Sequence, residues 1–179
     1  MAKLQSDPEW VERDAARREQ RAELAVAWAR AEQPVLKRLA EVGIELRSLA
    51  AFSKLPASPE AMEILLEELR TSRDPRMRHA IGMALSRKES QRYWEPLFTA
   101  FVDENDEYAR NGIANALIRA ATATRVSDLL TLVHDERFES QRLVLLNALR
   151  RFKTGKEALS RLLGDPLLGP EARRLLGEQ

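Results

Sequence analysis

The sequence repeats at an interval of 32 residues across positions 59–151, and this repeat limits the fold more strongly than any other feature. The first matching set is Met62, Trp94 and Val126. Three more apolar sets lie three, four and seven positions later: Leu65, Leu97 and Leu129; Leu66, Phe98 and Leu130; Leu69, Phe101 and Val133. This spacing places large apolar side chains on one face of an α-helix. The sequence therefore predicts a helix with a buried stripe at the start of each unit.

A second apolar stripe follows in the same register. Its matching positions are Ile81, Ile113 and Leu145; Leu85, Leu117 and Leu149; and, among smaller residues, Ala80, Gly112 and Val144, then Ala84, Ala116 and Ala148. Each unit is therefore predicted to be two antiparallel helices joined by a tight turn. Because one such hairpin cannot bury both stripes, neighbouring units must stack on one another.

Turn and capping residues mark the same units. Ser58-Pro59 offers an N-cap followed by proline at the first helical position, and Asp74-Pro75 does so for the second helix. Asp106 stands at the equivalent place in the second unit, whereas the third unit has Phe138 there and lacks a capping acid.

The two ends of the chain depart from the repeat. A fourth, shortened unit is expected over residues 156–179. At the other end a long charged helix opens at Asp7-Pro8, and we expect Pro34 to interrupt it before a short helix over 35–42 ends at Gly43. The predicted fold is all-α: a right-handed α-solenoid of three full helix pairs and a truncated one (56–179), with an N-terminal helical cap (1–55).

Composition narrows the function classes. The chain has 179 residues, no cysteine and a formal net charge of +1. Thiolate metal sites and cysteine nucleophiles are excluded, and the balanced charge does not favour bulk attraction to nucleic acid. The N-terminal stretch lacks the apolar core of a signal peptide, and no apolar stretch is long enough to span a bilayer. These features predict a cytoplasmic protein without membrane contact.

Residues 74–85, DPRMRHAIGMAL, resemble the second half of a HEAT repeat. In that family an aspartate in the turn, an arginine four residues later and a closing Ala-Leu pair recur from unit to unit. The matching residues in the second unit are Asp106, Arg110, Ala116 and Leu117, and those in the third are Arg142, Ala148 and Leu149. The resemblance implies an interaction scaffold, although bilin lyases and certain alkylpurine DNA glycosylases also have HEAT-like folds.

Within the predicted solenoid, the second helices line the concave surface and carry polar side chains that the core does not use. Arg87, Arg119 and Arg151 would form a ladder there, with Asn115 and Asn147 as an amide row beside it. The alternative is that these arginines only complement helix C-termini. The predicted partner-binding residues are Arg76, His79, Met83, Arg87, Tyr108, Asn111, Asn115, Arg119, Leu143, Asn147 and Arg151.

No catalytic or metal-binding set stands out. His79 and His134 lie in different units, and neither has a ligand-like partner one helical turn away. The recurring Arg78, Arg110 and Arg142 are expected to bond carboxylates or carbonyls of the adjacent unit. Trp94 and Trp28 are expected in the core, and Trp10 as an exposed anchor.

The leading hypothesis is a non-enzymatic HEAT-like module, without cofactor or metal, that binds a protein partner through the concave face. An acidic segment is the partner that the arginine ladder would favour. The alternatives are nucleic-acid binding related to the HEAT-like DNA glycosylases, a lyase of the bilin type, and self-assembly into a homo-oligomer through incompletely capped ends.

Overall fold

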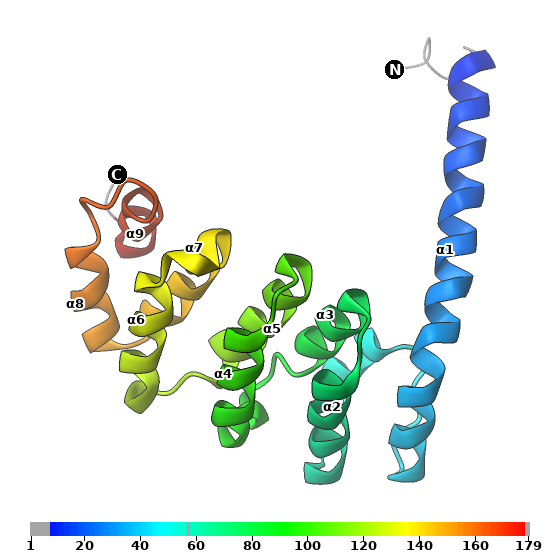
Figure 1. The fold of residues 1–179 in the computed structure, drawn as a ribbon, viewed down its shortest axis with the longest axis horizontal. Coiled ribbons are helices and arrows are strands. Elements are labelled where there is room, and N and C mark those ends of the chain that lie inside the picture. Colours follow the sequence, from blue (N-terminus) through cyan, green and yellow to red (C-terminus); the bar gives the residue numbers. More distant parts are fainter. Residues whose placement is uncertain (1–7, 57, 178–179) are drawn as a thin grey trace.

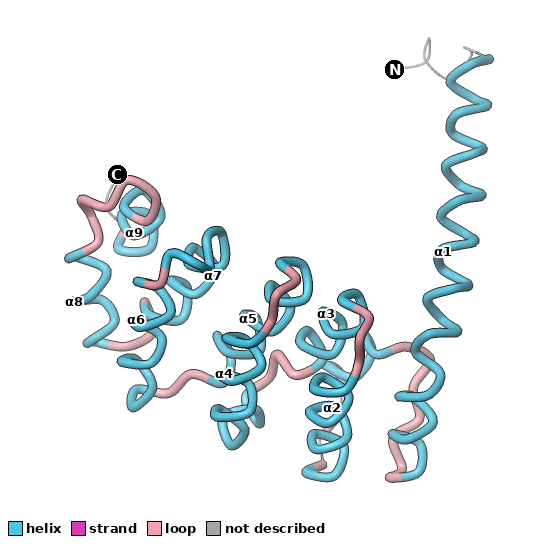
Figure 2. Tube along the Cα trace, viewed as in Figure 1, coloured by secondary structure: helices cyan, strands magenta, loops and turns pink. Residues whose placement is uncertain are grey.

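The computed structural model describes residues 8–56 and 58–177, and within them all regular structure is helical, with no strand. The prediction of an all-α protein is confirmed (Figure 2). The α-helices are α1 (Pro8–Glu41), α2 (Pro59–Thr71), α3 (Pro75–Ala84), α4 (Trp94–Asp103), α5 (Glu107–Ala120), α6 (Val126–His134), α7 (Glu139–Leu149), α8 (Lys153–Arg161) and α9 (Gly169–Leu176). Short 3-10 helices are η1 (Leu49–Lys54), η2 (Lys88–Tyr93), η3 (Ala123–Arg125) and η4 (Glu136–Phe138).

The 32-residue period is visible in the helix boundaries. The second helices of the three units begin at Pro75, Glu107 and Glu139. Helix pairs α2–α3, α4–α5, α6–α7 and α8–α9 follow one another along an arc in chain order (Figure 1). Helix α3 packs along α5, and α5 packs against α7. The shortened fourth pair, α8–α9, lies where the sequence predicted it.

The predicted stripes form the core. In the first helices, the matched sets at Met62, Leu65 and Leu69 are buried throughout, whereas the set at Leu66 is half-buried. In the second helices, the sets at Ile81 and Leu85 are fully covered. Burying each such large apolar side chain contributes about 1.5–3 kcal/mol, so each unit gains most of its stability from these stripes.

Two glycines allow α3 and α5 to touch through their backbones. A Cβ atom added to Gly112 would lie 2.4 Å from the carbonyl oxygen of His79, and one added to Gly82 would lie 2.5 Å from the carbonyl carbon of Gly112. Real Cβ atoms do not approach backbone atoms so closely. The register therefore requires glycine at this crossing, because any side chain would push the helices apart.

The helix starts agree with the predicted caps. Side-chain oxygens of Ser58, Asp74 and Asp106 accept hydrogen bonds from the backbone N–H groups of Ala61, Arg76 and Ala109. Phe138 precedes α7 without a side-chain cap, as predicted, and its ring is instead buried against Phe101 at 4.8 Å between centroids.

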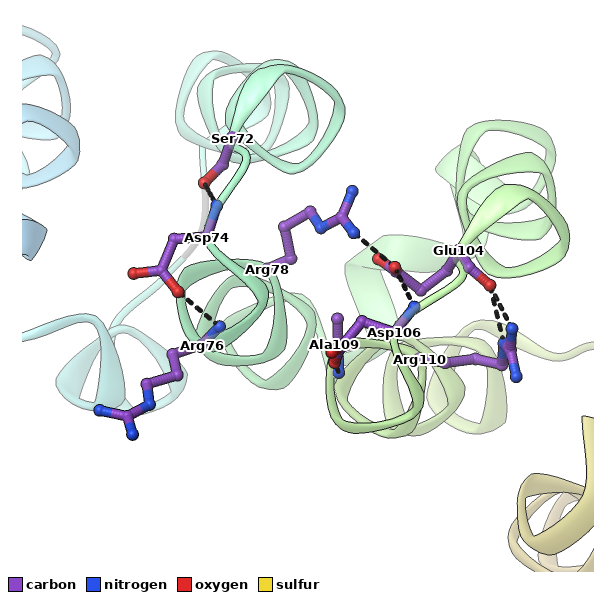
Figure 3. A network of polar contacts seen from close by, with 8 residues as sticks. All are labelled: Ser72, Asp74, Arg76, Arg78, Glu104, Asp106, Ala109 and Arg110. Carbon is purple, nitrogen blue, oxygen red and sulfur yellow. Dashed lines mark hydrogen bonds and ion pairs between the residues drawn. The ribbon is translucent and has the colours of Figure 1, made fainter.

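A polar network joins the first two units at the α4–α5 turn (Figure 3). The guanidinium of Arg78 pairs with the Glu104 carboxylate of the next unit. The same carboxylate accepts from the N–H of Asp106 at 2.8 Å, and the Glu104 carbonyl accepts from Arg110 Nε at 3.0 Å. In the third unit, Arg142 Nε donates to the Val133 carbonyl at 2.6 Å. The recurring arginines are structural, as predicted. Arg78 bonds the next unit, and Arg142 also reaches the next unit through an ion pair with Asp165 at 3.9 Å, whereas the Arg110–Glu104 and Arg142–Val133 contacts lie within one unit.

The prediction of a break at Pro34 is wrong. Helix α1 runs without interruption from Pro8 to Glu41, and it ends as predicted at Gly43, whose φ of 82° is left-handed. A proline inside a helix removes one hydrogen bond, and Pro34 is exposed, so water can solvate the carbonyl that is left without a partner. Burial of Val35, Leu36 and Leu39 just after the proline holds the last turns in place.

Only the end of α1 covers the first helix pair. Core residues in this part of the chain start at Glu32 and Val35, whereas positions 11–31 are exposed apart from half-buried Asp14 and Trp28. The N-terminal part of α1 accordingly projects from the rest of the molecule (Figure 1). Trp28 packs on the edge of the core rather than inside it, and half-buried Trp10 lies far along the projecting part. Of the predicted cap, residues 1–7 lie outside the described residues.

Glu32 joins α1 to η1 and gives a pH-dependent prediction. Its side chain is 2% exposed and accepts a hydrogen bond from the N–H of Leu49 at 3.3 Å. Burial raises the pKa of Glu32, and hydrogen bonds from the Leu49 backbone and the Trp28 side chain oppose this rise only in part. The folded state therefore holds this proton more tightly than the unfolded chain does. This tighter proton binding stabilises the folded state. The stabilisation is fully present below the ordinary glutamate pKa and is lost as the pH rises through the raised pKa of Glu32.

Glu32→Gln does not titrate and keeps an acceptor for Leu49. We expect its free energy of unfolding, relative to that of the wild type, to increase as the pH rises from about 4 to about 7. Urea denaturation of both proteins across this range measures the difference. A difference that shrinks with rising pH would show that the carboxylate is stabilised and not penalised at this site.

Candidate functional site

None of the predicted partner-binding residues is buried in the core. Met83 and Tyr108 are both exposed, Tyr108 by 55%. The others are exposed or half-buried: Arg76, His79, Arg87, Asn111, Asn115, Arg119, Leu143, Asn147 and Arg151. The repeat register therefore separated surface from core correctly on the second helices. It did not predict which of these side chains are already bonded inside the protein.

The arginine ladder is largely used for internal contacts. The guanidinium of Arg87 donates to the carbonyls of Phe52 at 3.2 Å and Leu55 at 2.8 Å, and it lies 5.0 Å from the centre of the Phe52 ring. The guanidinium of Arg151 donates to the carbonyls of Ile118 and Ala121. Partial burial lowers the pKa of Arg151, and the charge of Arg119 lowers it further.

Arg87 thus caps carbonyl groups at the end of η1, and Arg151 caps carbonyl groups at the end of α5. The expected row of three free charges is not present. The alternative, that these arginines complement helix C-termini, is closer to what is found. Arg119 differs from the other two, because its side chain makes no hydrogen bond or ion pair with the described residues.

Removing these contacts gives a direct test of their role. Arg87→Ala and Arg151→Ala should each lower the free energy of unfolding by about 1–2 kcal/mol, since each strands carbonyls that a charged donor now satisfies. Arg119→Ala should stay within about 0.5 kcal/mol of the wild type. Equal costs for all three, measured by chemical denaturation, would contradict the assignment of Arg87 and Arg151 as caps.

The predicted amide row does not extend across the units. The Asn115 side chain donates to the Asn111 carbonyl at 2.9 Å, and the Asn147 side chain donates to the Val144 carbonyl at 3.3 Å. Mid-helix asparagines commonly satisfy their amides on the preceding turn in this way. The Asn115 carbonyl accepts from the Ser86 hydroxyl at 3.0 Å, which adds a contact between α5 and the end of α3. These amides are local structural groups.

Three of the predicted residues come together with α1 to form a hollow that sequence analysis did not find. Arg76 and His79 in the first half of α3 and Tyr108 at the start of α5 line it. The projecting part of α1 forms the other wall, with Arg21, Leu24, Ala25 and Trp28, and the remaining lining residues are Asp74, Pro75, Ala80 and Asp106. The volume is about 1030 Å³. We call this hollow the α1 groove.

The wall on the α3–α5 side presents a flat aromatic surface. The His79 and Tyr108 rings stack with centroids 4.0 Å apart and an interplanar angle of 16°. His79 Nδ1 lies 2.8 Å from the carbonyl oxygen of Tyr108, and this contact fixes the histidine ring. On the opposite wall, Leu24 is 47% exposed and Trp28 is half-buried. The groove therefore has exposed apolar and aromatic side chains on both walls.

The acidic residues of the groove already accept hydrogen bonds within the protein, whereas the side chains of its arginines donate none to the described residues. Asp74 and Asp106 each accept a backbone hydrogen bond at 2.9 Å, because they are the N-caps of α3 and α5. Arg21 and Arg76 extend from opposite walls, and neither guanidinium has a hydrogen bond or ion pair with another described residue. The two arginines therefore keep all of their side-chain donors for a ligand, whereas each aspartate is already engaged by a helix N-terminus.

Among the described residues, no three histidine or carboxylate side chains lie close enough together to hold a metal ion. Nor, in the same parts of the chain, is any helix both long and apolar enough to cross a bilayer. The structure thus defines an all-helical protein built of successive helix pairs with an open groove at one end. Comparison with known proteins finds no matching family model, no matching curated protein and no matching solved structure.

Proposed function

We propose that this chain is a right-handed, HEAT-like α-solenoid that acts as a non-enzymatic interaction module and binds a segment of a protein partner in the α1 groove. The helix starts at 32-residue intervals support the repeat architecture, as do the capping aspartates and structural arginines at matched positions. A stack of such pairs is a rigid frame, and α1 adds a wall that no repeat unit supplies.

The exposed Tyr108 ring opposite Leu24 and Trp28 is the observation that carries the proposal. Tyrosine, tryptophan and leucine side chains that stay accessible within one hollow are typical of protein-binding surfaces, in which a few aromatic anchors supply most of the affinity. The stack with His79 holds the Tyr108 ring rigid, so binding would cost little side-chain entropy. Arg21 and Arg76 at the rim add charged groups that can select the partner.

Site-specific photo-crosslinking in the source cells tests the location of binding. Benzoylphenylalanine at position 108 should crosslink a discrete protein species that can be identified by mass spectrometry. The matched control carries the same group at Thr131, an exposed position on α6, and should not crosslink that species. Identical products from both positions, or none from position 108, would remove the groove as the binding surface. A crosslink to DNA or RNA would support the nucleic-acid alternative instead.

A further inference from the structure

The two uncommitted arginines of the α1 groove face the same hollow from different helices. Arg21 lies on the projecting part of α1, and Arg76 lies in the first turn of α3. Neither has a hydrogen bond or ion pair with another described residue, whereas Arg38 and Arg87 outside the groove are bonded to glutamates. Arginine prefers carboxylate partners, which its planar fork can bind through two parallel hydrogen bonds.

The two acidic residues of the groove do not cancel these charges. The Asp74 carboxylate is held on the N–H of Arg76, and the Asp106 carboxylate is held on the N–H of Ala109. Each lies at the positive end of a helix macrodipole, which offsets about half of an elementary charge. A ligand entering the groove therefore meets two arginines with unused donors and two aspartates whose negative charge is partly offset by helix N-termini.

Apolar surface lies between the charged groups. Leu24 and Trp28 line one wall and Tyr108 the other, so both walls offer apolar surface to an apolar side chain of a ligand. From this combination we propose that the α1 groove selects acidic peptide segments that carry an apolar anchor, with Arg21 and Arg76 as the carboxylate-binding pair. This inference rests on the proposed function, because it specifies the chemistry of the segment bound in the same groove.

Selection of random dodecapeptides displayed on phage tests the specificity without a known partner. Peptides enriched on the wild-type protein should contain more Asp and Glu than the input library, next to an aromatic or aliphatic residue. The double variant Arg21→Glu/Arg76→Glu should lose the acidic preference and select basic peptides. A synthetic acidic peptide from the wild-type pool should bind this variant at least about tenfold more weakly, since two charge pairs become repulsive.

Arg150→Glu/Arg161→Glu is the matched control, because Arg150 directly after α7 and Arg161 at the end of α8 are both exposed and do not line the groove, and the change in net charge is the same. This control should keep the acidic preference and the affinity of the wild type. Failure to enrich any peptide, enrichment without acidic residues, or equal weakening by both double variants would overturn the inference. If a protein partner is crosslinked at position 108 but the enriched peptides are not acidic, the proposed function stands and only the proposed acidic specificity is overturned.

Discussion

Replacing Gly112 with alanine should lower the free energy of unfolding by about 3 kcal/mol, at the upper end of the usual cost of overpacking a core. The new Cβ atom would lie 2.4 Å from the His79 carbonyl oxygen and 2.7 Å from its Cα atom. Both neighbours belong to the backbone of α3, so no side-chain rotation can relieve the clash. The two helices must separate, and every contact between the first and second units weakens with them.

Gly164→Ala is the matched control for this prediction. Gly164 lies in the turn after α8, no other atom comes within 4 Å of its added Cβ position, and its φ is not in the left-handed region. Alanine there should be neutral or stabilising by up to about 1 kcal/mol, through a lower entropy of the unfolded chain. Thermal and urea unfolding of both variants measures the contrast. Gly112→Ala with the stability of the control would mean that α3 and α5 do not meet at this crossing.

Glu104→Ala should have an effect of similar size, a loss of about 3 kcal/mol. The Glu104 side chain is 1% exposed, and its carboxylate both pairs with Arg78 and accepts from the N–H of Asp106. Removing one member of a buried ion pair costs about 3–5 kcal/mol, because the other charge is left without a partner. The expected loss is at the lower end, since the Arg78 side chain is 26% exposed and water can reach part of it.

Asp103→Ala, one residue earlier in the chain, is the control, because Asp103 is exposed and should cost no more than about 0.5 kcal/mol. Arg78→Ala in the Glu104→Ala background should add less to the loss than Arg78→Ala alone, since the pair is already broken. Chemical denaturation of the four proteins of this double-mutant cycle measures the coupling. Strictly additive losses would show that the two side chains do not stabilise the junction together.

The repeat could be predicted because the apolar stripes and the capping residues that define it are both local features of the sequence. Apolar stripes at helical spacing identified the core, and Asp74 and Asp106 marked the starts of the second helices at the residues where the structure has them. Helix α7 was also predicted to lack a capping acid at Phe138, and it does, although Asp135 caps the short 3-10 helix η4 just before it. Each of these features depends on residues within a few helical turns of one another.

The continuity of α1 and the internal role of the arginines could not be predicted in this way. Pro34 is a helix-breaking signal, and only the burial of Val35, Leu36 and Leu39 against the first unit offsets it. Arg87 and Arg151 were correctly placed outside the buried stripe, but a long side chain can reach solvent or a neighbouring carbonyl, and the Arg87 side chain is only 10% exposed. The sequence does not specify which carbonyls lie within reach. That Arg87 and Arg151 bond backbone carbonyls is a consequence of tertiary packing.

The α1 groove could not be predicted for the same reason. Tyr108, His79 and Arg76 were recognised on the second helices, whereas Arg21 and Leu24 lie more than one unit away in sequence. Leu24 and Trp28 continue the buried stripe of α1 toward its N-terminus, and this is the one signal that could have indicated them. Without a continuous α1, nothing in the sequence placed that stripe opposite α3 and α5.

The most direct test of the central claim is the affinity of the partner crosslinked at position 108 for two matched variants of α1. Leu24→Asp places a carboxylate inside the groove, and Val26→Asp places one on the same helix outside it, at a residue that is 62% exposed. By titration calorimetry with the purified partner, Leu24→Asp should weaken binding at least about tenfold, and Val26→Asp should leave it unchanged. Unchanged affinity in Leu24→Asp, or equal loss in both variants, would contradict binding in the α1 groove.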